Sequence, residues 1–104
     1  MSKNYIYLIK SDTSYKIGIS KNPYKRIKEL QTGNSLNLEL ISIFETCFAN
    51  KLEKTLHRTF EHLHDRGEWF FLSPDDIKGF IDLCEKCETN FNFLKENDNY
   101  YFNR

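Results

Sequence analysis

A chain of 104 residues is long enough for one domain with one hydrophobic core, because separate domains usually need about 100 residues each. Hydrophobic residues make up 39% and charged residues 29%, as in an ordinary globular protein, and no stretch approaches the roughly 18 apolar residues that would span a bilayer. The formal net charge is zero, which by itself argues against a nucleic-acid-binding protein, since these proteins are usually basic.

The charges are unevenly distributed along the chain. Residues 1–35 contain seven Lys or Arg and two acids, a net of +5, whereas residues 36–104 contain eight Lys or Arg and thirteen acids, a net of −5. Five cations and no acid lie within residues 16–28. A bipolar molecule can still turn one basic face towards a phosphate backbone. For Lys21, Lys25 and Lys28 individually, a solvated helix face is the alternative.

The N-terminal residues lead directly into a strand-like run, so we expect no signal peptide. Three cysteines cannot all pair within one chain, and this odd number fits a reducing compartment. We therefore expect a cytoplasmic protein without membrane association.

The first third of the chain predicts a hairpin followed by a helix. Tyr5–Ile9 and Tyr15–Ile19 are rich in β-branched and aromatic residues, and a cluster of turn residues separates them. Asn22 is a candidate N-cap and Pro23 a suitable first helical residue. We expect this helix to end near Gly33.

The remaining chain predicts one more strand and two helices. Leu38–Phe44 alternates as a third strand, and apolar residues spaced four, four and three apart predict a helix over Ala49–His64. After a short extended segment, Ser73 is the candidate N-cap of a helix that we expect to run to about Glu88. These elements predict an α+β domain with a small three-stranded, largely antiparallel sheet flanked by helices.

We place the domain at residues 1–90 and an aromatic, Asn-rich tail at residues 91–104. A docked aromatic strip and a frayed end both fit the composition of this tail. Its aromatic side chains are a candidate interface for a homodimer, with packing inside the chain as the alternative: Phe91, Phe93, Tyr100, Tyr101 and Phe102.

Tyr7 is the first candidate for chemistry. It shares a strand face with Tyr5, and Lys16 of the next strand lies within cross-strand reach. In a partly desolvated site, the Lys16 ammonium would lower the pKa of the Tyr7 phenol from about 10 and make it a usable general base. Gly18 marks a close backbone approach or a bulge. Packing tyrosines and an irregular strand edge are the alternatives.

Glu53 and His57 lie four residues apart, and therefore on one face of the second predicted helix. One carboxylate with water molecules is the usual way in which Mg²⁺ is bound. A surface glutamate beside a histidine is the alternative. Cys84 and Cys87 have no second pair of ligands at zinc spacing, so we do not expect a structural zinc site.

Four short motifs in a consistent order resemble the GIY-YIG nuclease superfamily, over about residues 5–72. They are Tyr5-Ile6-Tyr7, Lys16-Ile17-Gly18, the stretch from Gly18 to Arg26, and Leu52-Glu53-Lys54-Thr55-Leu56-His57. With the Gly-Glu-Trp-Phe that follows, this pattern is most similar to the branch found in proteins of phages and large DNA viruses and in their bacterial relatives.

The resemblance implies a metal-dependent endonuclease. Tyr7 would be the general base, Arg26 would neutralise the scissile phosphate, and Glu53 would hold Mg²⁺ or Mn²⁺. Lys16 stands in the place of the second motif's tyrosine and would assist Tyr7, and His57 would complete the catalytic set in place of a late asparagine of the family.

The resemblance also implies nucleic acid as the partner, DNA in preference to RNA, in a bacterial, phage-infected or virus-infected cell. Contacts to it are expected from five residues: Tyr5, Gly18, Lys21, Lys25 and Lys28. The alternative function is a catalytically weak module of the same fold that binds nucleic acid or a partner protein. Zero net charge favours this alternative, whereas a pure binder has no need of Tyr7, Arg26 and Glu53 together.

Overall fold

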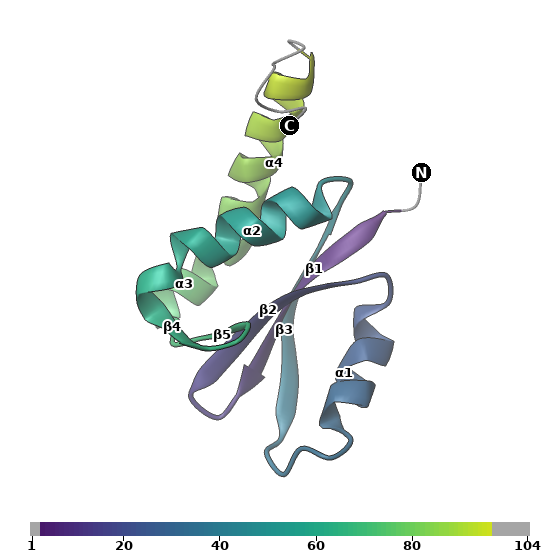
Figure 1. Ribbon diagram of the computed structural model, residues 1–104, viewed down its shortest axis with the longest axis vertical. Helices are drawn as coiled ribbons and strands as arrows, with labels where there is room; N and C mark the ends of the chain where they lie inside the picture. Colours follow the sequence, from purple (N-terminus) through teal and green to yellow (C-terminus); the bar gives the residue numbers. More distant parts are fainter. Residues whose placement is uncertain (1–2, 97–104) are drawn as a thin grey trace.

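The computed structural model describes residues 3–96. In chain order its elements are β1 (Asn4–Ser11), β2 (Ser14–Ser20), α1 (Pro23–Gln31), β3 (Leu38–Thr46), α2 (Ala49–Thr59), the 3₁₀ turn η1 (Glu61–Leu63), β4 (His64–Arg66), β5 (Trp69–Phe70), α3 (Pro74–Lys78) and α4 (Phe80–Glu96). Figure 1 shows the central strands with α2 across one end of the sheet, α1 on the opposite side and α4 extending past the sheet. No helix within the described range is long and apolar enough to cross a membrane.

The hairpin predicted from the sequence is present. β1 and β2 pair antiparallel from Tyr5 opposite Ser20 to Ser11 opposite Ser14. The turn between them places Asp12 at φ 53°, in the left-handed region that Asp tolerates better than most residues. α1 begins as expected, because the Asn22 side chain accepts a hydrogen bond from the Lys25 amide and Pro23 occupies the first turn.

The α+β class is confirmed, but the prediction of a three-stranded sheet is wrong. Across residues 3–96, five strands form one sheet in the order β3-β1-β2-β5-β4, with every pairing antiparallel. The additional strands, β4 and β5, contain three and two residues. Strands this short have no readable alternation, and they form only because β5 pairs with Tyr15 and Lys16 of β2.

Two helix boundaries also differ from the predicted ones. The helix expected over residues 49–64 ends at Thr59, and the later part of that range forms η1 and the start of β4. The helix expected from Ser73 to about Glu88 is divided at Gly79, which caps α3, and its second part, α4, continues to Glu96. The Ser73 cap itself is confirmed as a capping box with Asp76.

Alternation along β1 sends its side chains into different clusters on the two faces of the sheet. Ile6 and Leu8 enter a large apolar core together with α2, α4 and β5 residues such as Leu56, Phe80 and Phe70. Tyr7 and Ile9 enter a smaller cluster with Leu38, α1 and Trp69. The sheet is therefore covered on both faces within the described residues, and Tyr7 lies on the α1 side.

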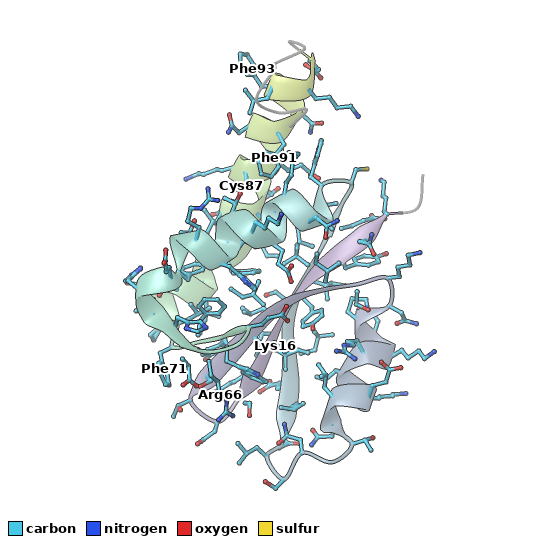
Figure 2. The ribbon with its side chains drawn as sticks, viewed as in Figure 1. Lys16, Arg66, Phe71, Cys87, Phe91 and Phe93 are labelled. Atoms are coloured by element: carbon cyan, nitrogen blue, oxygen red, sulfur yellow. The ribbon has the colours of Figure 1, made fainter. Side chains whose placement is uncertain are left out.

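The beginning of the predicted tail lies within α4. Phe91 packs against Phe48, with ring centroids 5.6 Å apart, whereas the Phe93 side chain is 61% exposed further along the helix (Figure 2). The remaining tail aromatics, Tyr100, Tyr101 and Phe102, lie outside the described residues. The division of the chain at residue 90 and the homodimer stay predictions.

Candidate active site

The candidate site lies at the edge of β2, where β5 stops pairing with it. In the described register β5 pairs with Tyr15 and Lys16. At the next residue, the Ile17 amide donates to the Glu68 carbonyl (3.1 Å) and the Ile17 carbonyl accepts from His57 Nε2 (2.9 Å). The α2 helix and the turn before β5 are therefore both anchored to the same residue of β2, and this brings their side chains to one edge.

Tyr7 packs directly over Gly18, its cross-strand partner. A Cβ atom on Gly18 would lie 2.4 Å from the Tyr7 hydroxyl oxygen and 2.5 Å from Cζ, so any other residue would displace the phenol. The close approach expected at Gly18 is confirmed. Lys16 is opposite Ile9, two residues further along the hairpin and on the same face as Tyr7, and so reaches Tyr7 diagonally.

Lys16 lowers the pKa of Tyr7 as expected, but the net shift of that pKa is upward. Burial raises the pKa of the Tyr7 phenol above its ordinary value of 10.0. The positive charges of Lys16 and Arg26 oppose that rise but do not outweigh it. Tyr7 is only 2% exposed, and this burial is the physical reason for the difference.

Lys16 has a carboxylate partner that was not identified from the sequence. Its ammonium lies 2.8 Å from Glu68 Oε1, with 13% of the Lys16 side chain exposed, and also lies over the Trp69 ring. In the sequence, Glu68 stands in Gly67-Glu68-Trp69-Phe70, an acid beside a glycine at the start of an extended segment. This local pattern does not predict which strand the segment pairs with, and therefore does not predict the contact with Lys16.

Glu53, His57 and Glu68 form a cluster that is suited to a cation. Among the residues that the structure describes, one ligand atom from each lies within 4.8 Å of the others, and all three side chains are partly buried. Burial, followed by the charge of Glu68, raises the pKa of Glu53 above its ordinary value. Two partly buried carboxylates repel one another, and a divalent cation between them would relieve that repulsion.

The hydrogen bond of His57 determines which of its nitrogens is available. Because a carbonyl oxygen can only accept, Nε2 carries the proton in the bond to Ile17, and a neutral His57 keeps its lone pair on Nδ1. A backbone carbonyl holding one ring nitrogen is the usual arrangement behind a metal-ligating histidine. The donor set of two carboxylates and one imidazole therefore fits a divalent metal ion, and Glu53 need not bind it alone.

Arg26 reaches the site from α1. The positive charge of its guanidinium acts on the Tyr7 phenol and lowers its pKa, and the guanidinium lies 3.5 Å from Glu29 one turn further along the helix. Tyr7, Lys16, Arg26, Glu53 and His57, all selected from the sequence, thus surround one strand edge.

The residues expected to contact nucleic acid are more dispersed. Tyr5 is partly buried opposite Ser20. Lys21 and Lys25 are exposed around the start of α1 and Lys28 is exposed in its last turn, and none of them joins the salt bridges found within residues 3–96. Contact with a ligand remains a prediction for all of them.

Comparison with known proteins identifies the family. No curated protein and no solved structure matches the chain. A family model, the T5orf172 domain, matches residues 4–85, a range that includes all the residues of the candidate site and both flanking helices. This domain is a nuclease-related domain found in phage proteins. Because the match covers most of the chain, the protein belongs to the T5orf172 domain family.

Proposed function

We propose that this domain is a divalent-metal-dependent endonuclease of the GIY-YIG type that hydrolyses phosphodiester bonds of DNA. The family supports a nuclease-related, DNA-binding role. The observation that carries the finer proposal is the convergence of Tyr7, Arg26 and Glu53 from β1, α1 and α2 on one strand edge. Charges of Lys16 and Glu68 act on both Tyr7 and Glu53, so the three elements form one electrostatic unit.

Arg26 is assigned to the scissile phosphate. Its side chain is 42% exposed, so a phosphate can reach it from solvent. The guanidinium is planar and always charged, and it can bind two phosphate oxygens at once. Its charge lowers the pKa of Tyr7, so the phosphate-binding group and the proton acceptor influence one another electrostatically.

Glu53 is assigned to the metal ion, Mg²⁺ or Mn²⁺, with His57 Nδ1 and Glu68 as further candidate ligands. When bound, such an ion would neutralise charge that develops on the leaving oxygen. An imidazole nitrogen binds Mn²⁺ and later transition metals more readily than it binds Mg²⁺. A donor set that includes His57 therefore favours Mn²⁺ at least as much as Mg²⁺. The anchor of His57 on Ile17 would hold the ligand in place before the ion arrives.

Tyr7 is assigned the role of general base at its hydroxyl oxygen. Because the pKa of Tyr7 is raised, little phenolate is present at neutral pH, and burial opposes loss of the phenol proton. The adjacent cations of Lys16 and Arg26 supply the opposing stabilisation of the phenolate. We therefore expect the cleavage rate to rise with pH through the alkaline range.

The same raised pKa favours a second candidate, a catalytically weak module of this fold that binds nucleic acid or a partner protein. Lys16 is already paired with Glu68 at 2.8 Å, which weakens its effect on Tyr7. In such a module the basic side chains would bind the nucleic acid or partner protein without promoting hydrolysis.

Cleavage of supercoiled plasmid with Mg²⁺ or Mn²⁺ distinguishes the two functions. We expect wild-type protein to nick or linearise the plasmid, and Arg26→Ala to lower the rate by a factor of about 10²–10³, as is typical when one charge-stabilising donor is removed. Glu53→Ala should be at least as deficient. Arg58→Ala and Glu61→Ala, at exposed positions on α2 and η1, are matched controls that should retain activity. Cleavage that survives both site substitutions would contradict the proposal, and salt-sensitive binding without cleavage would establish the weak module.

A further inference from the structure

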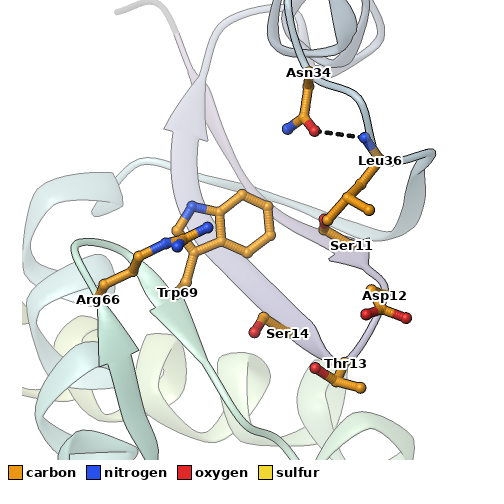
Figure 3. Close-up of a pocket in the computed structure, with 8 residues that line it drawn as sticks. All are labelled: Ser11, Asp12, Thr13, Ser14, Asn34, Leu36, Arg66 and Trp69. Carbon is orange, nitrogen blue, oxygen red and sulfur yellow. Dashed lines mark hydrogen bonds between the residues drawn. The ribbon is translucent and has the colours of Figure 1, made fainter.

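A polar hollow lies beside the candidate active site, at the turn end of the hairpin (Figure 3). Its walls are the β1–β2 turn at residues 11–14, Asn34 and Leu36 from the loop after α1, and Arg66 and Trp69 from β4 and β5. Its volume is about 260 Å³. This is slightly below the range of about 300–1,000 Å³ that is typical of sites for drug-sized ligands, and it suits a smaller group such as one nucleotide.

The loop wall of the hollow is held by side-chain hydrogen bonds from Gln31 at the end of α1. Gln31 Nε2 donates to the Leu36 carbonyl (2.8 Å), and Gln31 Oε1 accepts from the Leu38 amide (2.8 Å). Asn34 Oδ1 accepts from the Leu36 amide (2.9 Å), the bond drawn in Figure 3. A wall fixed in this way costs little ordering entropy when a ligand binds.

Arg66 and Trp69 give the hollow its chemical character. They are cross-strand partners in the β4–β5 pair, and both side chains face the hollow in Figure 3. Arg66 is exposed and takes part in none of the salt bridges among residues 3–96. An indole beside an unpaired guanidinium provides a surface for a base and a donor pair for a phosphate, which together are the groups of a nucleotide.

The hollow is linked to the candidate active site through Lys16. Its ammonium lies 5.8 Å from the centroid of the Trp69 ring and 2.8 Å from Glu68, a member of the candidate metal cluster. A strand bound at the cluster therefore has its neighbouring nucleotides within reach of Trp69. Asp12, at the opposite rim, repels a phosphate and so favours its placement on the Arg66 side.

We propose that this hollow is a subsite for one unpaired nucleotide of the nucleic-acid strand, with its base against Trp69 and its phosphate on Arg66. The proposal rests on the proposed function in taking that strand as the ligand. A nucleotide drawn out of the stack in this way would make the enzyme prefer single-stranded or distorted DNA next to the cleavage position. Hydroxyl and amide groups in the walls can hydrogen-bond to the base edge.

Intrinsic fluorescence tests the subsite directly, because Trp69 is the one tryptophan in the chain. The protein, kept in EDTA so that no cleavage occurs, is titrated with a single-stranded ten-residue oligothymidylate and with an abasic oligomer of the same length. We expect the oligothymidylate to quench Trp69 and to bind at least about fivefold more tightly than the abasic oligomer, since one stacked base contributes at least about 1 kcal/mol.

Three variants complete the test. Arg66→Ala should weaken oligothymidylate binding severalfold, whereas Arg58→Ala, which removes the same charge from an exposed position on α2, should not. Glu53→Ala should leave the base-dependent quench in place. Equal quenching by both oligomers, or equal affinity of Arg66→Ala and wild type, would overturn the subsite even if plasmid cleavage is found. A base-dependent quench in a protein that cleaves nothing would support the subsite and refute the nuclease.

Discussion

The two faces of the β1–β2 hairpin differ in what they contribute to the molecule. On the α2 and α4 side, Ile6, Leu8 and Ile17 are fully buried in an apolar core that contains no charged side chain among its buried members. On the α1 side, the fully apolar Ile9 shares its cluster with Tyr7, whose pKa is lowered by the charges of Lys16 and Arg26. One face stabilises the sheet, and the other holds polar groups that desolvation disfavours.

The difference arises from alternation along the strands, since neighbouring residues of β1 face opposite sides. It also explains why the candidate site lies at an edge. Glu53 and His57 belong to α2, on the apolar side, and they can meet Tyr7 only by passing the end of the β2–β5 pairing. Substitutions on the two sides should therefore separate stability from cleavage.

The largest effect on stability is expected in the apolar core. Phe80 of α4 is fully buried, and Phe80→Ala should lower the free energy of unfolding by about 3–5 kcal/mol, measured by urea denaturation. Phe93→Ala makes the same change on the same helix at a side chain that is 61% exposed, and should cost no more than about 0.5 kcal/mol. Similar losses in both variants would mean that α4 is held by contacts other than this core.

Gly18→Ala should have a smaller effect on stability and a larger one on cleavage. The added Cβ would collide with the Tyr7 ring, which is 2% exposed and has little room to move, so we expect a cost of about 1–3 kcal/mol and a displaced hydroxyl. Gly79→Ala is the matched control, since its nearest neighbour is the Asp75 carbonyl oxygen at 3.4 Å. A Gly18→Ala protein that cleaves plasmid at the wild-type rate would exclude Tyr7 as the base.

Sequence patterns predicted the parts of this molecule that depend on local structure. The hairpin, the start of α1 and the third strand follow from alternation, an Asn-Pro cap and turn residues. The spacing of Phe60 and Leu63 led to the prediction that the second helix continues to His64. A 3₁₀ turn also places residues three apart on one side, so this spacing does not distinguish the two. The partnership of Glu68 with Lys16 joins positions 52 apart, and no local periodicity carries that information.

The smallest effect is expected from Glu53→Gln in the absence of metal. The pKa of Glu53 is raised in the folded protein, so its protonated form is favoured there. Its contribution to stability is present below the ordinary value of 4.5 and is lost as the pH rises through the raised pKa. Above that range the ionised carboxylate opposes folding, and a neutral amide, which can donate to Glu68, should raise the Tm by a few degrees at pH 8 and leave it unchanged at pH 4.

Addition of Mn²⁺ should reverse the order of the Tm values, so that wild type becomes more stable than Glu53→Gln. Such a reversal would connect the repulsion between Glu53 and Glu68 to metal binding. A ligand that binds only the folded state raises the Tm according to its concentration and affinity, so wild type should gain with Mn²⁺ and Glu53→Gln should gain much less. Glu45→Gln, at an exposed position on β3, should respond as wild type does. Equal gains in Tm in wild type and Glu53→Gln would show that Glu53 does not bind the metal. The raised pKa of Glu53 would then reflect only its burial and the nearby charge of Glu68.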